Sequence, residues 1–340
     1  MGFGPVSNMN YYPLLFEPNL HTVIWGGNRL RPYKGLPSSD EPVGESWEVS
    51  AVPSSPSIIE NGEQKGKDLI TVISENPSAI LGKKVARKYK GELPLLVKFI
   101  DAKRDLSIQV HPTDEMAMRE HGKSGKSEMW YILKADVGAH LYAGFNKEIT
   151  PEEFQQRIAD GTIIDVLADH QVKAGDVFYL PAGRVHAICG GIMLVEVQQS
   201  SDVTYRIYDY NRPGMDGKPR ELHTELAAKA LDFRAIDKIR TVYTKRANKA
   251  VPILDSPNFN VCLMEASDLI HRDLREFDCF VIAVCIEGDC QIRVRATEDE
   301  VFLKEGNSTL IPAVVAEYDI IPINAKTRIL EAYVGKTEST

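Results

Sequence analysis

The sequence predicts a mainly β protein made of two β-barrel modules, with helices inserted between the strands. Short apolar runs alternate with Gly and Pro along the 340 residues, a pattern typical of many short strands joined by turns. A weak internal repeat links the middle of the chain to its end. Helical patterns are confined to a few segments. Together these observations favour two copies of one barrel.

Four apolar runs are the clearest strand candidates: residues 95–100, 129–133, 177–180 and 192–197. Thr150, Pro151 and Glu153 have the spacing of an N-cap, a first helical proline and a capping-box acid, so a helix is expected to begin at Pro151. Further helical patterns cover residues 221–233 and 67–89, the second broken near Asn76 and Pro77.

The internal repeat aligns Gly175–Pro181 with Gly306–Pro312, and Met129–Ile132 with Cys279–Ile282. In this alignment the residue equivalent to His186 is Glu317, so a site that needs this imidazole belongs to the first copy. We therefore expect an N-terminal metal-binding domain with helical insertions over residues 1–235. A related C-terminal domain without a metal site is expected over residues 236–340.

Charge and composition exclude several classes of function. The formal net charge is −8, so no basic field draws the chain to nucleic acid or to an anionic membrane. No apolar segment approaches the roughly 18 residues of a membrane span. The five cysteines include no Cys-x-x-Cys pair and are expected to be free thiols in a reducing compartment. We expect a cytoplasmic protein that is a monomer or a weak homo-oligomer.

A set of candidate metal ligands follows the strand pattern. Gln109 and His111 are two residues apart at the end of an apolar stretch, so they project from one face of a strand. Glu128 opens the next strong strand, and His186 follows a tight turn. Two imidazoles, a carboxylate and an amide oxygen suit Zn, Fe, Mn, Ni or Co better than a thiolate-seeking metal.

Six short motifs in order carry a resemblance to a known family. They are Ile24–Gly27, Gly44–Ser50, Leu106–Pro112, Lys126–Tyr131, Pro181–Ala187 and Thr204–Tyr210. With them the chain resembles the type I mannose-6-phosphate isomerases, or phosphomannose isomerases, in their short bacterial form. Members of this family belong to the cupin superfamily, and the resemblance implies a double cupin fold. It extends over most of the chain.

The resemblance also implies roles for individual residues. Gln109, His111, Glu128 and His186 would hold one divalent metal ion, most often zinc, and Arg206 would be an active-site residue. Lys126, Ser107 and Lys98 would line a sugar-phosphate pocket. The large helical insertion of the long eukaryotic form is missing, and phosphate binding would fall to Arg212, or to Lys218 or Arg220.

These residue types suit the conversion of mannose 6-phosphate to fructose 6-phosphate. An aldose–ketose isomerase removes a proton next to a carbonyl, and the resulting cis-enediol needs a cation to meet its negative charge. Arg206 offers a permanently charged fork for this purpose. The general base stays open among Glu196, Asp209, Glu48 and a water on the metal.

Two other functions compete with this interpretation. Two histidines and a carboxylate also describe the metal site of a cupin oxygenase, although Gln109, Lys126 and Arg206 argue against it. A cupin that binds sugar phosphate without catalysis is the third reading, because a fold alone does not establish activity.

Overall fold

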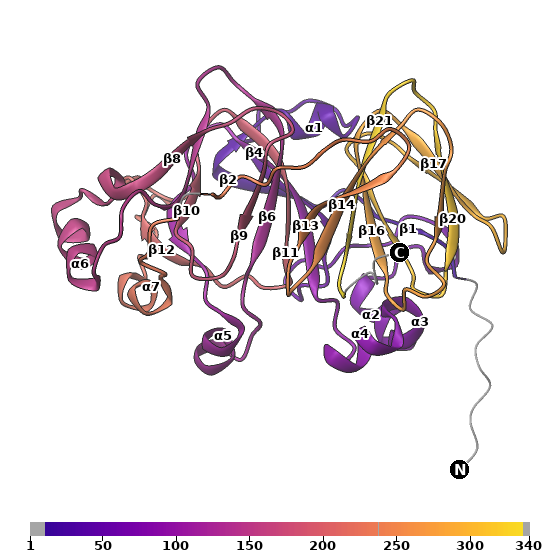
Figure 1. The fold of residues 1–340 in the computed structure, drawn as a ribbon, viewed down its shortest axis with the longest axis horizontal. Helices are drawn as coiled ribbons and strands as arrows, with labels where there is room; N and C mark the ends of the chain where they lie inside the picture. Colours follow the sequence, from indigo (N-terminus) through magenta and orange to yellow (C-terminus); the bar gives the residue numbers. More distant parts are fainter. Residues whose placement is uncertain (1–10, 237, 336–340) are drawn as a thin grey trace, which may run out of the picture.

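The computed structural model describes residues 11–236 and 238–335. Two antiparallel β-barrels lie side by side, each formed by two sheets (Figure 1). No helix in the described part of the chain is long and apolar enough to cross a membrane. The strands of the two barrels confirm the predicted mainly β class.

The sheets of the N-terminal barrel have six and five strands. In spatial order, the six-stranded sheet contains β2 (Leu20–Gly27), β3 (Val43–Val49), β4 (Leu95–Ala102), β11 (Ile192–Gln199), β6 (Glu128–Ala135) and β9 (Val177–Leu180). The five-stranded sheet contains β12 (Tyr205–Tyr208), β5 (Ile108–Val110), β10 (His186–Ile188), β7 (His140–Phe145) and β8 (Leu167–Gln171). The four strands expected from apolar runs are β4, β6, β9 and β11.

Five strands of the larger C-terminal sheet repeat this order, β1 (Leu14–Leu15) is added at its edge in place of a counterpart to β2, and the smaller sheet has one strand fewer. The larger sheet contains β1, β19 (Ser308–Ile311), β16 (Val281–Glu287), β21 (Thr327–Tyr333), β14 (Asn260–Ala266) and β13 (Ala250–Asp255), and the smaller one β15 (Ile270–Asp273), β20 (Glu317–Pro322), β17 (Cys290–Val294) and β18 (Glu300–Leu303). Because β1 pairs with β19, the start of the chain contributes to the C-terminal sheet. The division into residues 1–235 and 236–340 stays a prediction.

The register of the strands corrects the alignment expected from the sequence. Gly175 donates a backbone hydrogen bond to Ile132, and Gly306 donates the matching one to Cys285, so Met129 corresponds to Ile282 and not to Cys279. His186 pairs with Gln109, whereas Tyr318 pairs with Arg272.

A second pair of contacts fixes the position that corresponds to His186. In the first barrel, the strand pair His186–Ala143 lies next to a backbone hydrogen bond from Gly144 to Val185. In the second barrel, the pair Tyr318–Val294 lies next to the matching bond from Arg295 to Glu317. The counterpart of His186 is thus Tyr318, and the expected equivalence with Glu317 is wrong by one residue. One additional residue in the turn after Pro312 accounts for the difference, and a short sequence motif contains no signal for it.

Helices cover the ends of the barrels. α6 (Pro151–Asp160) begins as predicted, with the Thr150 hydroxyl accepting the hydrogen bond of the Glu153 backbone N–H at 3.1 Å. The pattern over 67–89 is three short helices, α2 (Leu69–Glu75), α3 (Pro77–Leu81) and α4 (Lys83–Lys88), and the predicted break at Asn76 is confirmed. α7 (Thr224–Ala230) is shorter than the expected 221–233.

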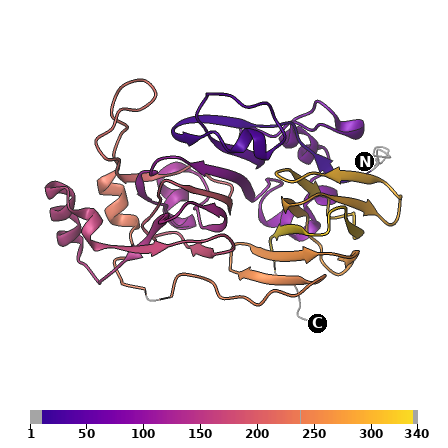
Figure 2. The same cartoon turned by 90° about the horizontal axis from the view of Figure 1, so that it is seen from above.

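Two further helices were not expected from the sequence: α1 (Leu30–Tyr33) and α5 (Asp114–His121). Figure 2 shows the two barrels from above, with α6 and α7 at the end remote from the C-terminal barrel.

The barrels pack through the outer faces of their six-stranded sheets. Val97 and Phe99 of β4 belong to the same buried cluster as Ile282 and Leu330 of the C-terminal barrel. Because side chains alternate along a strand, Lys98 and Ile100 point the other way, into the N-terminal barrel. The apolar interface therefore fixes which face of β4 is available to a site.

Candidate active site

The four predicted metal ligands come from both sheets of the N-terminal barrel. Gln109 lies in β5, and His111 follows the end of that strand. Glu128 is the first residue of β6, and His186 is the first residue of β10. The barrel thus brings strand ends together that are 77 residues apart along the chain.

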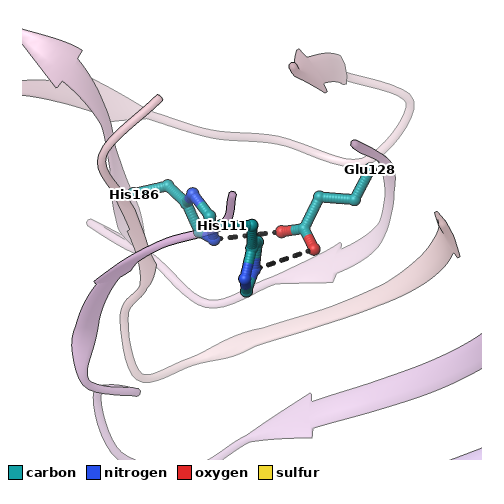
Figure 3. Close-up of side chains that lie close together, drawn as sticks. All are labelled: His111, Glu128 and His186. Atoms are coloured by element: carbon teal, nitrogen blue, oxygen red, sulfur yellow. Dashed lines mark ion pairs between the residues drawn. The ribbon is translucent and has the colours of Figure 1, made fainter. Parts of the chain in front are cut away.

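The side chains of His111, Glu128 and His186 converge at one buried point (Figure 3). His186 Nε2 lies 3.1 Å from one carboxylate oxygen of Glu128, and His111 Nε2 lies 3.3 Å from the other. Gln109 Nε2 is 3.4 Å from His186 Nε2, so the amide borders the same point. Among the described residues, this is the only group of three or more His, Cys, Asp or Glu that could hold a metal ion.

Hydrogen bonds to backbone carbonyls orient both imidazoles. The Nδ1 atom of His111 lies 3.0 Å from the carbonyl oxygen of Val203, and Nδ1 of His186 lies 2.8 Å from that of Arg184. A carbonyl oxygen can only accept, so each Nδ1 carries the hydrogen and each Nε2 presents a lone pair. This is the arrangement by which proteins orient a histidine that binds a metal.

The charge balance of the cluster also fits a cation. Burial and the positive charge of Lys126 lower the pKa of His111 to about 3. Burial alone would raise the pKa of Glu128, but the positive charge of Lys126 and the adjacent imidazoles hold it well below its usual range. Neither carboxylate oxygen of Glu128 accepts a hydrogen bond of good geometry. A buried anion facing two nitrogen lone pairs is a site that a divalent metal would complete.

A cavity of about 240 Å³ opens beside this cluster. Its walls include Gln109, Ser107, Lys98, Lys126, Glu45, Glu196, Trp47, Asp202, Arg206 and Arg220. Four of these side chains are cationic and come from separate segments of the chain. Three others are carboxylates, so the formal positive excess is small. A small anionic ligand is still suited, because each cation can meet a different oxygen.

Lys98 links two carboxylates on the wall of the cavity. Its Nζ lies 3.5 Å from a Glu45 oxygen and 3.4 Å from Oε1 of Glu196, and 4.9 Å from the centre of the Trp47 ring. The indole of Trp130 donates a hydrogen bond to the other oxygen of Glu196 at 3.0 Å. Burial and the charge of Glu128 raise the pKa of Glu196, against the opposing effect of Lys98.

Arg206 also lines the cavity, whereas Arg212 is not among the described wall residues. Arg206 donates a hydrogen bond to the carbonyl of Glu221 at 2.9 Å, and its buried Nε has no partner in the described structure. Arg212 and Arg220 both bind Asp209, at 2.9 and 2.6 Å. Of the three arginines considered above, Arg206 and Arg220 face the cavity.

The structure separates the candidates for the general base. Asp209 is held by its two arginines. Glu48 is buried near the junction of the two barrels, where Lys34 lies 2.7 Å from it and Ser308 of the C-terminal barrel donates a hydrogen bond to it. Glu196 is the one of these three carboxylates that lines the cavity.

Sequence reasoning did not single out Glu45 and Trp47 as wall residues. Both belong to the motif Gly44–Ser50, and they alternate with buried positions along β3. Trp47 donates a hydrogen bond to Glu45 at 2.6 Å. Their spacing of two within a strand was the signal that could have placed them on one face.

Comparisons with known proteins give the family. The family model that matches residues 14–138 is the catalytic domain of type I phosphomannose isomerase. The chain is 35% identical to the probable mannose-6-phosphate isomerase GmuF of Bacillus subtilis, over 91% of this chain and 96% of that protein. It is 34% identical to a mannose-6-phosphate isomerase of Streptococcus mutans, over 90% and 94%.

Solved structures agree. The crystal structure of the mannose 6-phosphate isomerase from Bacillus subtilis superposes with a TM-score of 0.84 at 30% identity, covering 95% of this chain and 99% of that one. A putative mannosephosphate isomerase from Archaeoglobus fulgidus shares the fold, with a TM-score of 0.78 at 21% identity, covering 97% and 100%. The length and identity of these matches establish that the chain belongs to the type I phosphomannose isomerase family.

Proposed function

We propose that this protein is an aldose–ketose isomerase that interconverts mannose 6-phosphate and fructose 6-phosphate. The observation that carries the proposal is the buried His111–Glu128–His186 cluster beside a cavity lined by four cations. The names of the relatives support the same substrate pair. The buried free cysteines suit a reducing compartment, which we take to be the cytoplasm.

We propose that Gln109, His111, Glu128 and His186 hold one divalent ion, and that the ion is zinc. The mixed nitrogen and oxygen donors, and the lone pairs directed at one point, fit the ligand types that zinc takes in proteins. When bound, such an ion supplies positive charge that stabilises negative charge on the substrate oxygens.

The cationic wall supplies substrate binding in this proposal. Lys126, Lys98 and Ser107 lie beside the ligand cluster, and Arg206 and Arg220 line the same cavity. A guanidinium can contact two oxygens at once, so Arg206 is placed to stabilise the charge that develops on the substrate. Arg212 acts through Asp209, which it shares with Arg220.

Glu196 is our candidate for the general base. It would remove the proton from C2 of the open-chain aldose and return it to C1, while the hydroxyl proton moves between the two oxygens. Trp130 fixes one carboxylate oxygen, which leaves the oxygen near Lys98 to carry the proton. A raised pKa brings a carboxyl group closer to the range in which it exchanges protons near neutral pH.

A coupled assay for fructose 6-phosphate formation from mannose 6-phosphate, with metal analysis of the same sample, tests the proposal. Turnover that depends on bound metal is expected. Oxygen uptake by the iron-loaded protein would instead favour an oxygenase. Binding of mannose 6-phosphate without turnover in a metal-replete sample would favour a non-catalytic binding protein.

A further inference from the structure

The turn between β13 and β14 of the C-terminal barrel reaches the metal-binding barrel. Asn258 in this turn donates hydrogen bonds from Nδ2 to the hydroxyl of Ser127 at 2.9 Å and to Oε1 of Gln199 at 3.0 Å. Ser127 lies between Lys126 and the proposed ligand Glu128. The amide of Asn258 therefore joins the C-terminal barrel to a segment that contains the cavity-lining Lys126 and the proposed ligand Glu128.

Ser127 connects several parts of the ligand cluster. Its backbone N–H donates to Oε1 of Gln199 at 2.8 Å, and its carbonyl accepts from the Gln199 backbone at 3.1 Å. Its hydroxyl also accepts from the backbone of Ala182 at 3.1 Å, in the turn that leads to His186. Ser127 thus ties the start of β6 to the turn before the second imidazole.

The network continues to the other side of Lys126. Nε2 of Gln199 donates to Asp114 at 3.0 Å, and the same carboxylate oxygen accepts from the backbone of Gly125 at 2.8 Å. Lys126 Nζ lies 3.2 Å from both His111 Nε2 and Glu128 Oε2. Displacement of residues 125–127 would therefore change the distances within the cluster directly.

The turn that carries Asn258 is closed by hydrogen bonds and anchored by a buried side chain. In its turn, the Ser256 hydroxyl donates to the carbonyl of Phe259 at 2.6 Å, and the Phe259 backbone N–H donates to Ser256 at 3.2 Å. Phe259 is fully buried in the cluster between the barrels. A donor fixed in this way can set the position of the groups it binds.

We propose that Asn258 is a positioning residue for the metal site, acting through Ser127 and Gln199. The C-terminal barrel then contributes to the site through this amide although it does not supply a ligand. The inference rests on the proposed metal-dependent function. Outer hydrogen-bond partners of metal ligands affect metal affinity by roughly 10- to 100-fold. Asn258 acts further out, through the backbone that joins Ser127 to Glu128, so an effect no larger than the lower end of this range is expected.

The test is the Zn²⁺ dissociation constant of the full-length Asn258→Ala protein, measured by competition with a chromophoric chelator. An increase of about 10-fold over wild type is expected. Asn258→Leu keeps the approximate side-chain shape but removes the amide donors without adding charge, so the same direction is expected and the test survives if the alanine variant folds poorly. Wild-type affinity in both folded variants would overturn the inference.

Asn324→Ala is the matched control. This amide also lies in a turn of the C-terminal barrel, where its oxygen accepts a hydrogen bond from Asp289 at 2.6 Å. It should leave the zinc affinity unchanged whatever it does to the melting temperature, and an equal loss there would show that Asn258 acts only through stability.

A double-mutant cycle tests the route through Ser127. In a Ser127→Ala background, Asn258→Ala should weaken zinc binding by a smaller factor than in wild type, because the two residues share a hydrogen bond. Equal factors in the two backgrounds would contradict the route. If the wild-type protein does not bind Zn²⁺, the proposed metal-dependent function fails. If the wild-type protein binds Zn²⁺ and the Asn258 variants bind it equally well, only the role of Asn258 fails.

Discussion

The two barrels share the order of most of their strands but differ at the position of the ligand cluster. The residues that correspond to Gln109, His111, Glu128 and His186 are Arg272, Leu274, Val281 and Tyr318. Leu274 and Val281 have no donor atom for a metal, and Arg272 is a permanent cation. One scaffold therefore holds a candidate metal site in the first copy and an ion-paired core in the second.

A buried glutamate has the same position in both barrels. Glu196 pairs across the strands with Trp130, and Glu331 pairs with Ala283 in the corresponding register. Arg272 lies 2.7 Å from Glu331, whose other oxygen accepts a hydrogen bond from Tyr318 at 2.6 Å. Glu196 shares Lys98 with Glu45 and faces a cavity. The same strand position thus holds an ion-paired acid in one barrel and a cavity-facing acid in the other.

Removing one ligand should have the largest effect in the first barrel. His186→Ala should lose its metal and its isomerase activity together, because the remaining ligands hold an ion weakly. Tyr318→Phe at the matching position should keep metal and activity and lose about 1–3 kcal/mol of unfolding free energy, since Glu331 loses a buried donor. Metal analysis, turnover and urea unfolding of both proteins check this. Stoichiometric metal in an active His186→Ala protein would rule out the ligand assignment.

Replacing the two corresponding glutamates, Glu196 and Glu331, should have opposite effects on turnover and stability. Glu196→Gln should lose about 10²- to 10⁴-fold in turnover, the usual range for a proton-transfer group. Its stability should not fall near neutral pH, because a carboxyl whose pKa is raised in the folded state disfavours folding once it ionises.

Glu331→Gln should instead be destabilised by about 3 kcal/mol, because the partly buried Arg272 loses its carboxylate. Its turnover at a temperature where it is folded should match wild type. Turnover and urea unfolding of the two variants side by side check the pair. Similar activity losses in both would show that Glu196 acts through structure.

Sequence patterns predicted the barrel strands and the shared face of Gln109 and His111 because both depend on local spacing, whereas the full ligand set came from the family resemblance. The apolar run of β4 and the i, i+2 placement of Gln109 and His111 are read from adjacent residues. The correspondence of His186 with Tyr318 depends on one extra turn residue, which only the strand pairing reveals. The contact of Asn258 with Ser127 joins residues 131 positions apart, and no local pattern encodes it.

Arg206 is carried by β12, a strand of the five-stranded sheet for which the four-stranded sheet has no equivalent in the described chain. If the guanidinium meets charge that develops on the substrate, Arg206→Ala should keep its metal and fold and lose on the order of 10²-fold in turnover. Arg206→Lys should fall between Ala and wild type, because an ammonium does not reproduce the planar fork. Steady-state kinetics with metal content and thermal unfolding check this, and unchanged turnover in a metal-replete Arg206→Ala protein would remove Arg206 from the mechanism.

The smallest expected effect concerns how the stability of the C-terminal barrel depends on pH. Burial alone would raise the pKa of Asp319, but bonds from Arg295, His271 and Arg293 lower it below its usual value. A carboxyl with a lowered folded-state pKa stabilises the protein above its unfolded pKa of about 3.9, and this contribution disappears as the pH falls through the folded value. Asp319→Asn should therefore cost stability at pH 7 and progressively less below about pH 4.

The size of this loss should be modest and sensitive to salt. Asp319 is buried, but its three partners are 37–48% exposed, so solvent screens the interactions and about 1 kcal/mol is expected. Urea unfolding of Asp319→Asn and wild type at pH 7 and pH 3, at low and high salt, measures it. Glu196→Gln should change stability at neutral pH in the opposite direction, because the raised pKa of Glu196 makes its ionised form unfavourable in the folded protein. A stability difference for Asp319→Asn that is constant between pH 7 and pH 3 would show that the ion pairs do not stabilise this barrel.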